Sequence, residues 1–191
     1  MIASKHSSIC LVAAAALAFA LALAATTARA AHAPAHAGVA PSTRKPSVAE
    51  RELLHSHELW ATIDVCSPSD QPNTVGIRGS MPGDKHQGEK MYMSFRLQYM
   101  SASDQWVDLT SGASSDFVAV GSGASARQGG TSFDLKPVSG KPPVTLRGVV
   151  DFEWRRGATI VYSAAEPTTA GHKSLAGADP ADFSAGTCLI G

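Results

Sequence analysis

Residues 91–100 alternate strictly between apolar and polar side chains, and no other feature of the chain restricts its fold so strongly. The apolar set is Met91, Met93, Phe95, Leu97 and Tyr99, and the polar set includes Ser94, Arg96 and Gln98. A period of two places the two sets on opposite faces of a β-strand. We therefore expect a long strand with one face on a core and the other in water.

Residues 144–154 predict a second long strand of the same kind. One face is Val144, Leu146, Gly148, Val150, Phe152 and Trp154, and the other is Thr145, Arg147, Asp151 and Glu153, with Val149 as the exception. A tight turn at Gly157 then lets residues 159–164 pair back as a hairpin. Shorter runs that predict further strands lie at residues 59–66, 75–81, 106–109, 117–120, 133–135 and 187–190.

Glycine and proline separate these runs. The chain has 17 Gly and 11 Pro, and the turn signals are Ser67-Pro68, Pro82-Gly83, Ser111-Gly112, 121–123, Gly129-Gly130 and Pro142-Pro143. Short strands at regular spacing with this punctuation are typical of antiparallel sandwiches. The sequence predicts an all-β protein, an antiparallel sandwich of about seven to nine strands in a single domain, residues 57–191.

The first 30 residues have the three-part pattern of a secretory signal peptide. A polar start with Lys5 precedes an uncharged Ala- and Leu-rich run, and Ala28-Arg29-Ala30 provides a cleavage site. Cleavage after Ala33 and retention as an anchor are the alternatives. Residues 31–56 predict a flexible tether, within which residues 48–54 predict one or two helical turns. No later segment is apolar enough to span a membrane, so we expect a secreted or envelope-associated protein.

Two cysteines, Cys66 and Cys188, remain once the leader with Cys10 is removed. An even count in an exported chain predicts one disulfide. The charges balance at 16 basic and 16 acidic residues, and Lys5 and Arg29 both lie in the leader. The rest of the chain is therefore slightly acidic, which excludes the usual basic nucleic-acid surface.

The run from Trp60 to Cys188 resembles an immunoglobulin-like or fibronectin-III-like sandwich in strand number and spacing. It departs from true immunoglobulin domains because the next Trp after Cys66 is Trp106, and Gly186 occupies the position of the Tyr before the second Cys. The resemblance therefore implies architecture alone.

Several short motifs carry a second resemblance. They are Gln71-Pro72-Asn73-Thr74 with Gly76-Ile77-Arg78-Gly79, Met91-Tyr92-Met93, Leu146-Arg147-Gly148, Gly171-His172 and Gly177-Ala178-Asp179-Pro180. In these the chain is similar to small exported proteins of high-GC bacteria that have no known function. This resemblance implies a fold and a location, and brings no activity with it.

Two regions are candidates for recognition of a protein or polysaccharide of the envelope or the medium. The first is the polar sheet face, with Arg96, Gln98, Arg147, Asp151, Glu153 and Arg155. The second is the long connection 166–186, with His172, Lys173, Asp179 and Asp182. Loops of this length are usually functional, although this one also suits a lid over the sandwich with Phe183 in the core.

Metal binding is an alternative from another class. Copper suits imidazole and thioether ligands, and the candidates are His55, His57 and His86 with Met81, Met91, Met93 and Met100. The methionines also continue apolar stripes, as core fillers do. A calcium loop at Asp179 and Asp182 has too few oxygen ligands for the usual pattern.

No motif for nucleophilic catalysis or nucleotide binding is present. The segment 121–125 contains Gly and Ser but lacks the G-x-S-x-G pattern, and no P-loop or dinucleotide fingerprint occurs. We therefore expect a non-enzymatic binding module without a cofactor. A hydrolase with an unrecognised site is the third hypothesis.

Overall fold

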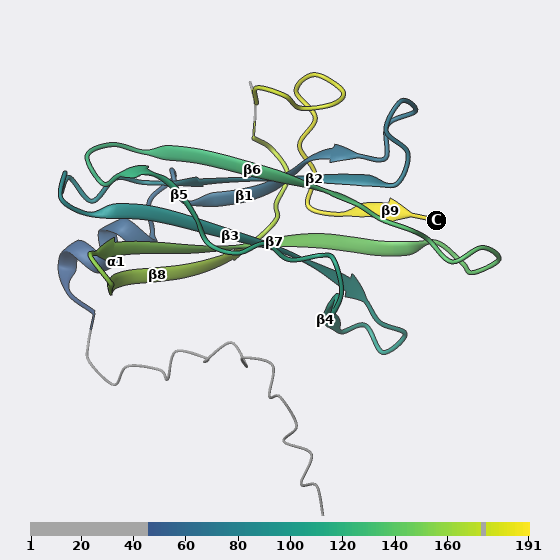
Figure 1. Ribbon diagram of the computed structural model, residues 1–191, viewed down its shortest axis with the longest axis horizontal. Coiled ribbons are helices and arrows are strands. Elements are labelled where there is room, and N and C mark those ends of the chain that lie inside the picture. The colour runs from purple at the N-terminus through teal and green to yellow at the C-terminus, as the bar shows by residue number, and fades with distance from the viewer. Residues whose placement is uncertain (1–45, 173–174) are drawn as a thin grey trace, which may run out of the picture. The chain divides into compact units, whose positions relative to one another are not determined.

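The computed structural model describes residues 46–172 and 175–191, which form two layers of antiparallel β-sheet with one short helix (Figure 1). The elements in chain order are α1 (Val48–Leu54), β1 (Trp60–Cys66), β2 (Thr74–Met81), β3 (Lys90–Met100), β4 (Trp106–Asp108), β5 (Val118–Ser122), β6 (Arg127–Asp134), β7 (Val144–Arg156), β8 (Thr159–Pro167) and β9 (Cys188–Ile190). The predicted all-β sandwich is confirmed, with nine strands in the described part of the chain.

The two sheets have different sizes. Three strands form the smaller sheet in the order β1-β2-β6, and six strands form the larger one around the central pair β3 and β7. In the larger sheet β4 and β5 both pair with β3, while β8 and β9 both pair with β7. The two longest predicted strands are therefore neighbours, and they are paired from Lys90↔Arg155 to Tyr99↔Leu146.

The core lies between the sheets and follows the predicted alternation. Phe95, Leu97, Phe152 and Trp154 are each at most 1% exposed. The Trp154 indole Nε1–H donates a hydrogen bond of 3.0 Å to the Pro82 carbonyl, so the one polar group of this side chain is satisfied inside the core. Because these side chains all point inward, the polar positions between them must point outward.

Two glycines expected in a turn lie inside a strand. Gly129 and Gly130 belong to β6 and pair with Gly79 and Arg78 of β2. A Cβ on Gly129 would lie 3.0 Å from Val120 Cγ1 and 3.2 Å from Met93 Sδ. The prediction of a turn was wrong because these glycines serve close packing against neighbouring elements.

The predicted disulfide is confirmed between Cys66, at the end of β1, and Cys188, at the start of β9. The two residues are 122 positions apart in sequence. The bond links the two sheets, because β1 belongs to the smaller sheet and β9 pairs with β7 of the larger one. Closing a loop of this length stabilises a fold by up to about 5 kcal/mol in the chain-entropy model.

The helix α1 lies within residues 31–56, the segment for which the sequence predicted a flexible tether. Ser47 and Glu50 form a capping box, in which the Ser47 side chain accepts from the Glu50 amide and the Glu50 side chain accepts from the Ser47 amide. Leu53 is buried in the core cluster. Packed structure therefore begins before residue 57.

The predicted signal peptide (1–30) and the first part of the predicted tether (31–45) lie outside the described residues. Within the described part of the chain, no helix has the length and apolar character needed to cross a membrane.

Candidate functional site

The outer face of the six-stranded sheet holds all six residues predicted as a recognition face: Arg96, Gln98, Arg147, Asp151, Glu153 and Arg155. The strand register places Gln98 opposite Arg147 and Ser94 opposite Asp151. Because the inward positions of β3 and β7 are filled by core residues, these alternate positions share the opposite face. We call this surface the outer face.

One continuous network joins the charged groups of the outer face except Glu153 and Arg155, which pair with each other. Arg147 Nε donates to Gln98 Oε1 at 2.8 Å, and Gln98 Nε2 donates to Asp108 Oδ1, also at 2.8 Å. Arg96 Nε donates to the same Asp108 oxygen at 3.3 Å, and its NH1 group pairs with Asp151. Each guanidinium in this chain of contacts therefore has an acidic or amide partner within the face.

Two arginines also lie over aromatic rings. The Arg147 guanidinium carbon is 4.4 Å from the Trp106 ring centroid. That of Arg155 is 4.3 Å from the Tyr92 centroid and 4.9 Å from the Phe117 centroid, while Arg155 Nε donates to Glu153 at 2.5 Å. Stacking acts together with the Gln98 amide on Arg147 and with the Glu153 carboxylate on Arg155 to fix the orientation of each guanidinium.

Part of this polar face is buried, and Val149 marks one such position. It is the apolar exception in the outward set, it pairs with Arg96, and it is 4% exposed. Burial lowers the pKa of Arg147, with a further contribution from the nearby Arg96 charge, whereas Asp108 acts in the opposite direction. The charged side chains of the outer face are thus partly desolvated, and the buried Val149 lies among them.

Four residues of the outer face did not figure in the sequence prediction: Tyr92, Trp106, Asp108 and Phe117. Tyr92 shares its parity with Arg96 and was detectable from the alternation of β3. Trp106 and Asp108 are in the three-residue strand β4, which is too short to show a period. Phe117 precedes β5 and reaches Arg155 across the sheet, and no local pattern indicates that contact.

The long connection after β8 runs along the free edge of β1. Ile63 and Ala185 exchange backbone hydrogen bonds of 2.9 and 3.0 Å, the Asp179 amide donates to the Asp64 carbonyl, and the Thr169 amide donates to the Ala61 carbonyl. The predicted boundary at Glu166 shifts because β8 continues to Pro167. Phe183 packs against the core, as expected for a lid.

Two of the predicted residues of this connection, His172 and Asp179, contact strand β1. His172 stacks on Trp60 with 4.2 Å between ring centroids, and burial lowers its pKa. Asp179 forms a bridge with Val65, and Asp182 adopts a left-handed φ of 63°. Lys173 lies outside the described residues. The structure therefore places His172 and Asp179 against β1, which is distant from them in sequence.

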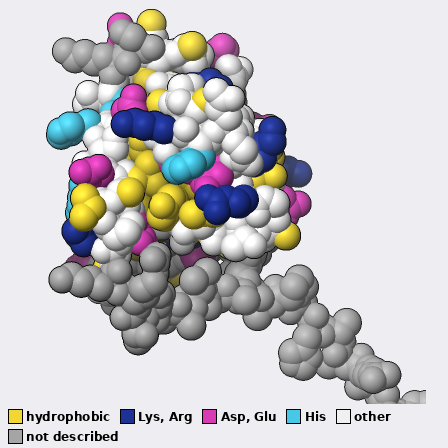
Figure 2. Space-filling model, turned by 90° about the vertical axis from the view of Figure 1, so that its left-hand side faces the viewer, with side chains coloured by type: hydrophobic (Ala, Val, Ile, Leu, Met, Phe, Trp, Pro, Cys, Tyr) yellow, Lys and Arg dark blue, Asp and Glu magenta, His cyan; other side chains and the backbone are white. Residues whose placement is uncertain are grey.

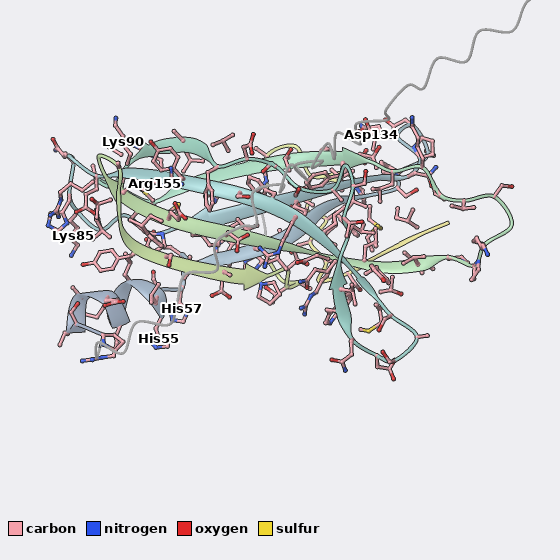
Figure 3. The ribbon with its side chains drawn as sticks, turned by 60° about the horizontal axis from the view of Figure 1, so that its bottom comes forward. His55, His57, Lys85, Lys90, Asp134 and Arg155 are labelled. Carbon is pink, nitrogen blue, oxygen red and sulfur yellow. A yellow bond between two sulfur atoms is a disulfide. The ribbon has the colours of Figure 1, made fainter. Side chains whose placement is uncertain are left out.

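The three histidines of the copper hypothesis do not form one group. His55 ends α1 and His57 follows it, whereas His86 lies in the connection that contains Lys85 (Figure 3). Met81, Met91 and Met93 are fully buried in the core, as expected of fillers. Among residues 46–172 and 175–191, the one group of three potential metal ligands is Asp84, His86 and Glu89, so Asp179 and Asp182 complete no such group with His172.

A groove of about 820 Å³ lies beside the connection between β6 and β7, and the sequence did not predict it. It is lined by the connection between β6 and β7 and by the ends of β7 and β9, with Leu135, Pro137, Val144 and Ile190 among its residues. Lys136 and Lys141 supply its basic groups and Asp134 its acidic one. Most of its lining is apolar, in contrast to the outer face.

Comparison of the chain with protein-family models and with curated proteins gives no match. The site is therefore interpreted from its own geometry.

Proposed function

We propose that this chain is an exported, non-enzymatic β-sandwich module that binds a protein of the cell envelope or the medium through the outer face. The observation that carries the proposal is the continuous network from Trp106 through Arg147, Gln98 and Asp108 to Arg96. Export is supported by the disulfide, which forms and persists in oxidising compartments.

The residue types of this face favour a protein partner. Trp, Tyr and Arg are the residues most enriched at the energetic centres of protein interfaces. Here the guanidinium groups are already held by rings and carboxylates, so little side-chain entropy is lost when a partner binds.

A polysaccharide fits this surface less well. Sugars stack on open aromatic faces, whereas Arg147 covers one face of Trp106 and Arg155 lies over Tyr92 and Phe117. The partly exposed charges suit carboxylates and guanidinium groups of a protein instead.

The test uses two double variants with the same change in charge. Arg147→Ala/Arg155→Ala alters the outer face, and Lys136→Ala/Lys141→Ala alters exposed lysines at the groove. Immobilised protein is exposed to culture medium and envelope extract of the source organism, captured proteins are identified, and each Kd is measured with the purified partner. Melting temperatures of both variants verify that they are folded.

We expect the outer-face variant to weaken binding by about tenfold or more, since loss of an interface centre costs ~2 kcal/mol or more. The groove variant is expected to bind as the wild type does. Equal binding by both variants would contradict the proposal. Capture that survives protease treatment of the extract would indicate a polysaccharide and overturn the choice of a protein partner.

A further inference from the structure

The connection between β2 and β3, residues 82–89, places three potential metal ligands together. One ligand atom each from Asp84, His86 and Glu89 lies within 4.8 Å of the others. The Asp84 and Glu89 side chains are 4% and 2% exposed. Two carboxylates at this depth are unusual, because burial of a charge is costly unless the charge is compensated.

Each carboxylate uses one oxygen to hold its position. The His86 backbone amide donates to Asp84 Oδ1 at 2.9 Å, and the Arg156 guanidinium pairs with Glu89 Oε1. The second oxygens, Asp84 Oδ2 and Glu89 Oε2, are buried without a hydrogen-bond partner. An oriented carboxylate with one free oxygen is the arrangement that outer partners give to metal ligands.

His86 supplies a third ligand from the solvent side. Its Nδ1 atom lies 3.5 Å from Asp84 Oδ2, and its side chain is 63% exposed. An exposed imidazole next to two buried carboxylates leaves a route by which an ion can enter. It also leaves a coordination position for water, as in zinc sites with three protein ligands.

The backbone holds the connection in this shape. The Lys85 amide donates to the Gly123 carbonyl and the Gly123 amide donates to the Glu89 carbonyl, both at 2.9 Å. A Cβ on Gly123 would collide with Asp84 Oδ1 and lie 2.8 Å from the His86 carbonyl oxygen. The turn between β5 and β6 is thus fitted closely against the ligands.

This end of the domain, where the β2–β3 connection, the β5–β6 turn and the β7–β8 hairpin meet, is viewed face-on in Figure 2. Histidine, acidic and basic side chains gather there around a small apolar patch. Arg156 of the hairpin compensates one of the two carboxylates. A divalent cation would compensate the other and replace the repulsion between the two free oxygens with coordination.

We propose that Asp84, His86 and Glu89 bind a divalent transition-metal cation, with Zn²⁺ as the best fit. One imidazole nitrogen and two carboxylate oxygens are ligands that Zn²⁺ accepts, whereas Ca²⁺ takes six to eight oxygens. The site is independent of the outer face. It shares His86 with the histidine and methionine set considered from the sequence, whereas Asp84 and Glu89 were not in that set.

The experiment titrates Zn²⁺ into EDTA-treated, dialysed protein, produced from the full chain, by isothermal calorimetry. His86→Ala removes the exposed ligand with little effect on packing. His57→Ala is the matched control, because it removes an exposed histidine outside the cluster. Melting temperature with and without Zn²⁺ is the second readout.

We expect the wild type to bind one Zn²⁺ per chain at this site and to melt at a higher temperature in its presence. His86→Ala should weaken the site about tenfold or more and remove the thermal shift, while His57→Ala leaves both within twofold. Equal Zn²⁺ affinity of His86→Ala and wild type would overturn the proposal, as would the absence of wild-type binding. Tight Ca²⁺ binding that is insensitive to His86→Ala would also overturn the choice of a transition metal.

Discussion

The outer face and the β2–β3 connection differ in whether their charged groups have hydrogen-bonding partners. On the outer face every guanidinium has a partner, and the Arg96 guanidinium has two, Asp108 and Asp151. In the connection two buried carboxylates each leave one oxygen without a hydrogen-bond partner. A satisfied network presents a fixed surface to a macromolecule, whereas buried unsatisfied oxygens favour a cation.

The location of Arg156 sharpens this contrast. It pairs with Glu89, yet it ends β7, the strand that also carries Asp151 and Glu153 of the outer face. Asp84 raises the pKa of Glu89 most strongly, burial raises it further, and Arg156 lowers it. The arginine therefore compensates part of the negative charge and leaves the rest.

The largest expected effect separates the core from the outer face. Trp154→Ala should lower the free energy of unfolding by ~3–5 kcal/mol, because it leaves a cavity and an unpaired Pro82 carbonyl. Arg96→Ala, on the other side of the sheet, should lower it by about 1 kcal/mol or less. Urea denaturation of both variants measures this difference, and equal losses would refute the assignment of inner and outer faces.

The next effect concerns the fit of the connection. Gly123→Ala should cost about 1–3 kcal/mol, because its methyl group meets Asp84 and the His86 carbonyl. Gly88→Ala is the control within the same connection, since nothing lies within 4 Å of the added Cβ. We expect it to change stability by about 0.5 kcal/mol or less in thermal unfolding. A neutral Gly123→Ala would mean that the connection is loosely held.

Periodicity predicted the outer face but not the connection. Arg96, Gln98 and Arg147 follow from strand parity, because a period of two fixes the direction of every side chain in β3 and β7. Asp84 and Glu89 lie in a connection without a period, and Arg156 reaches Glu89 from 67 positions away. Only the tertiary fold reveals that these two acids are buried.

The long connection after β8 shows the same limit. The length of this connection could be inferred from the sequence, because few of its residues belong to a strand pattern. The packing of Phe183 against the core could be inferred as well, because it is the one aromatic residue there. The attachment of the connection to β1 depends on backbone bonds between Ile63 and Ala185. Every residue except proline carries the same backbone donor and acceptor, so the side chains of the two segments do not indicate which edge is covered.

Two isosteric substitutions test most directly whether charge is matched on the outer face and unmatched in the connection. With EDTA present, Asp84→Asn should raise the free energy of unfolding by about 1 kcal/mol, because the amide removes a negative charge and its NH₂ group can donate to Glu89 Oε2. Asp151→Asn should lower it by about 0.5–1 kcal/mol, because Arg96 loses an ionised partner. Opposite signs in chemical denaturation at one fixed pH are the predicted result. A loss of stability in both variants would contradict the account, because it would show that the Asp84 charge is already compensated.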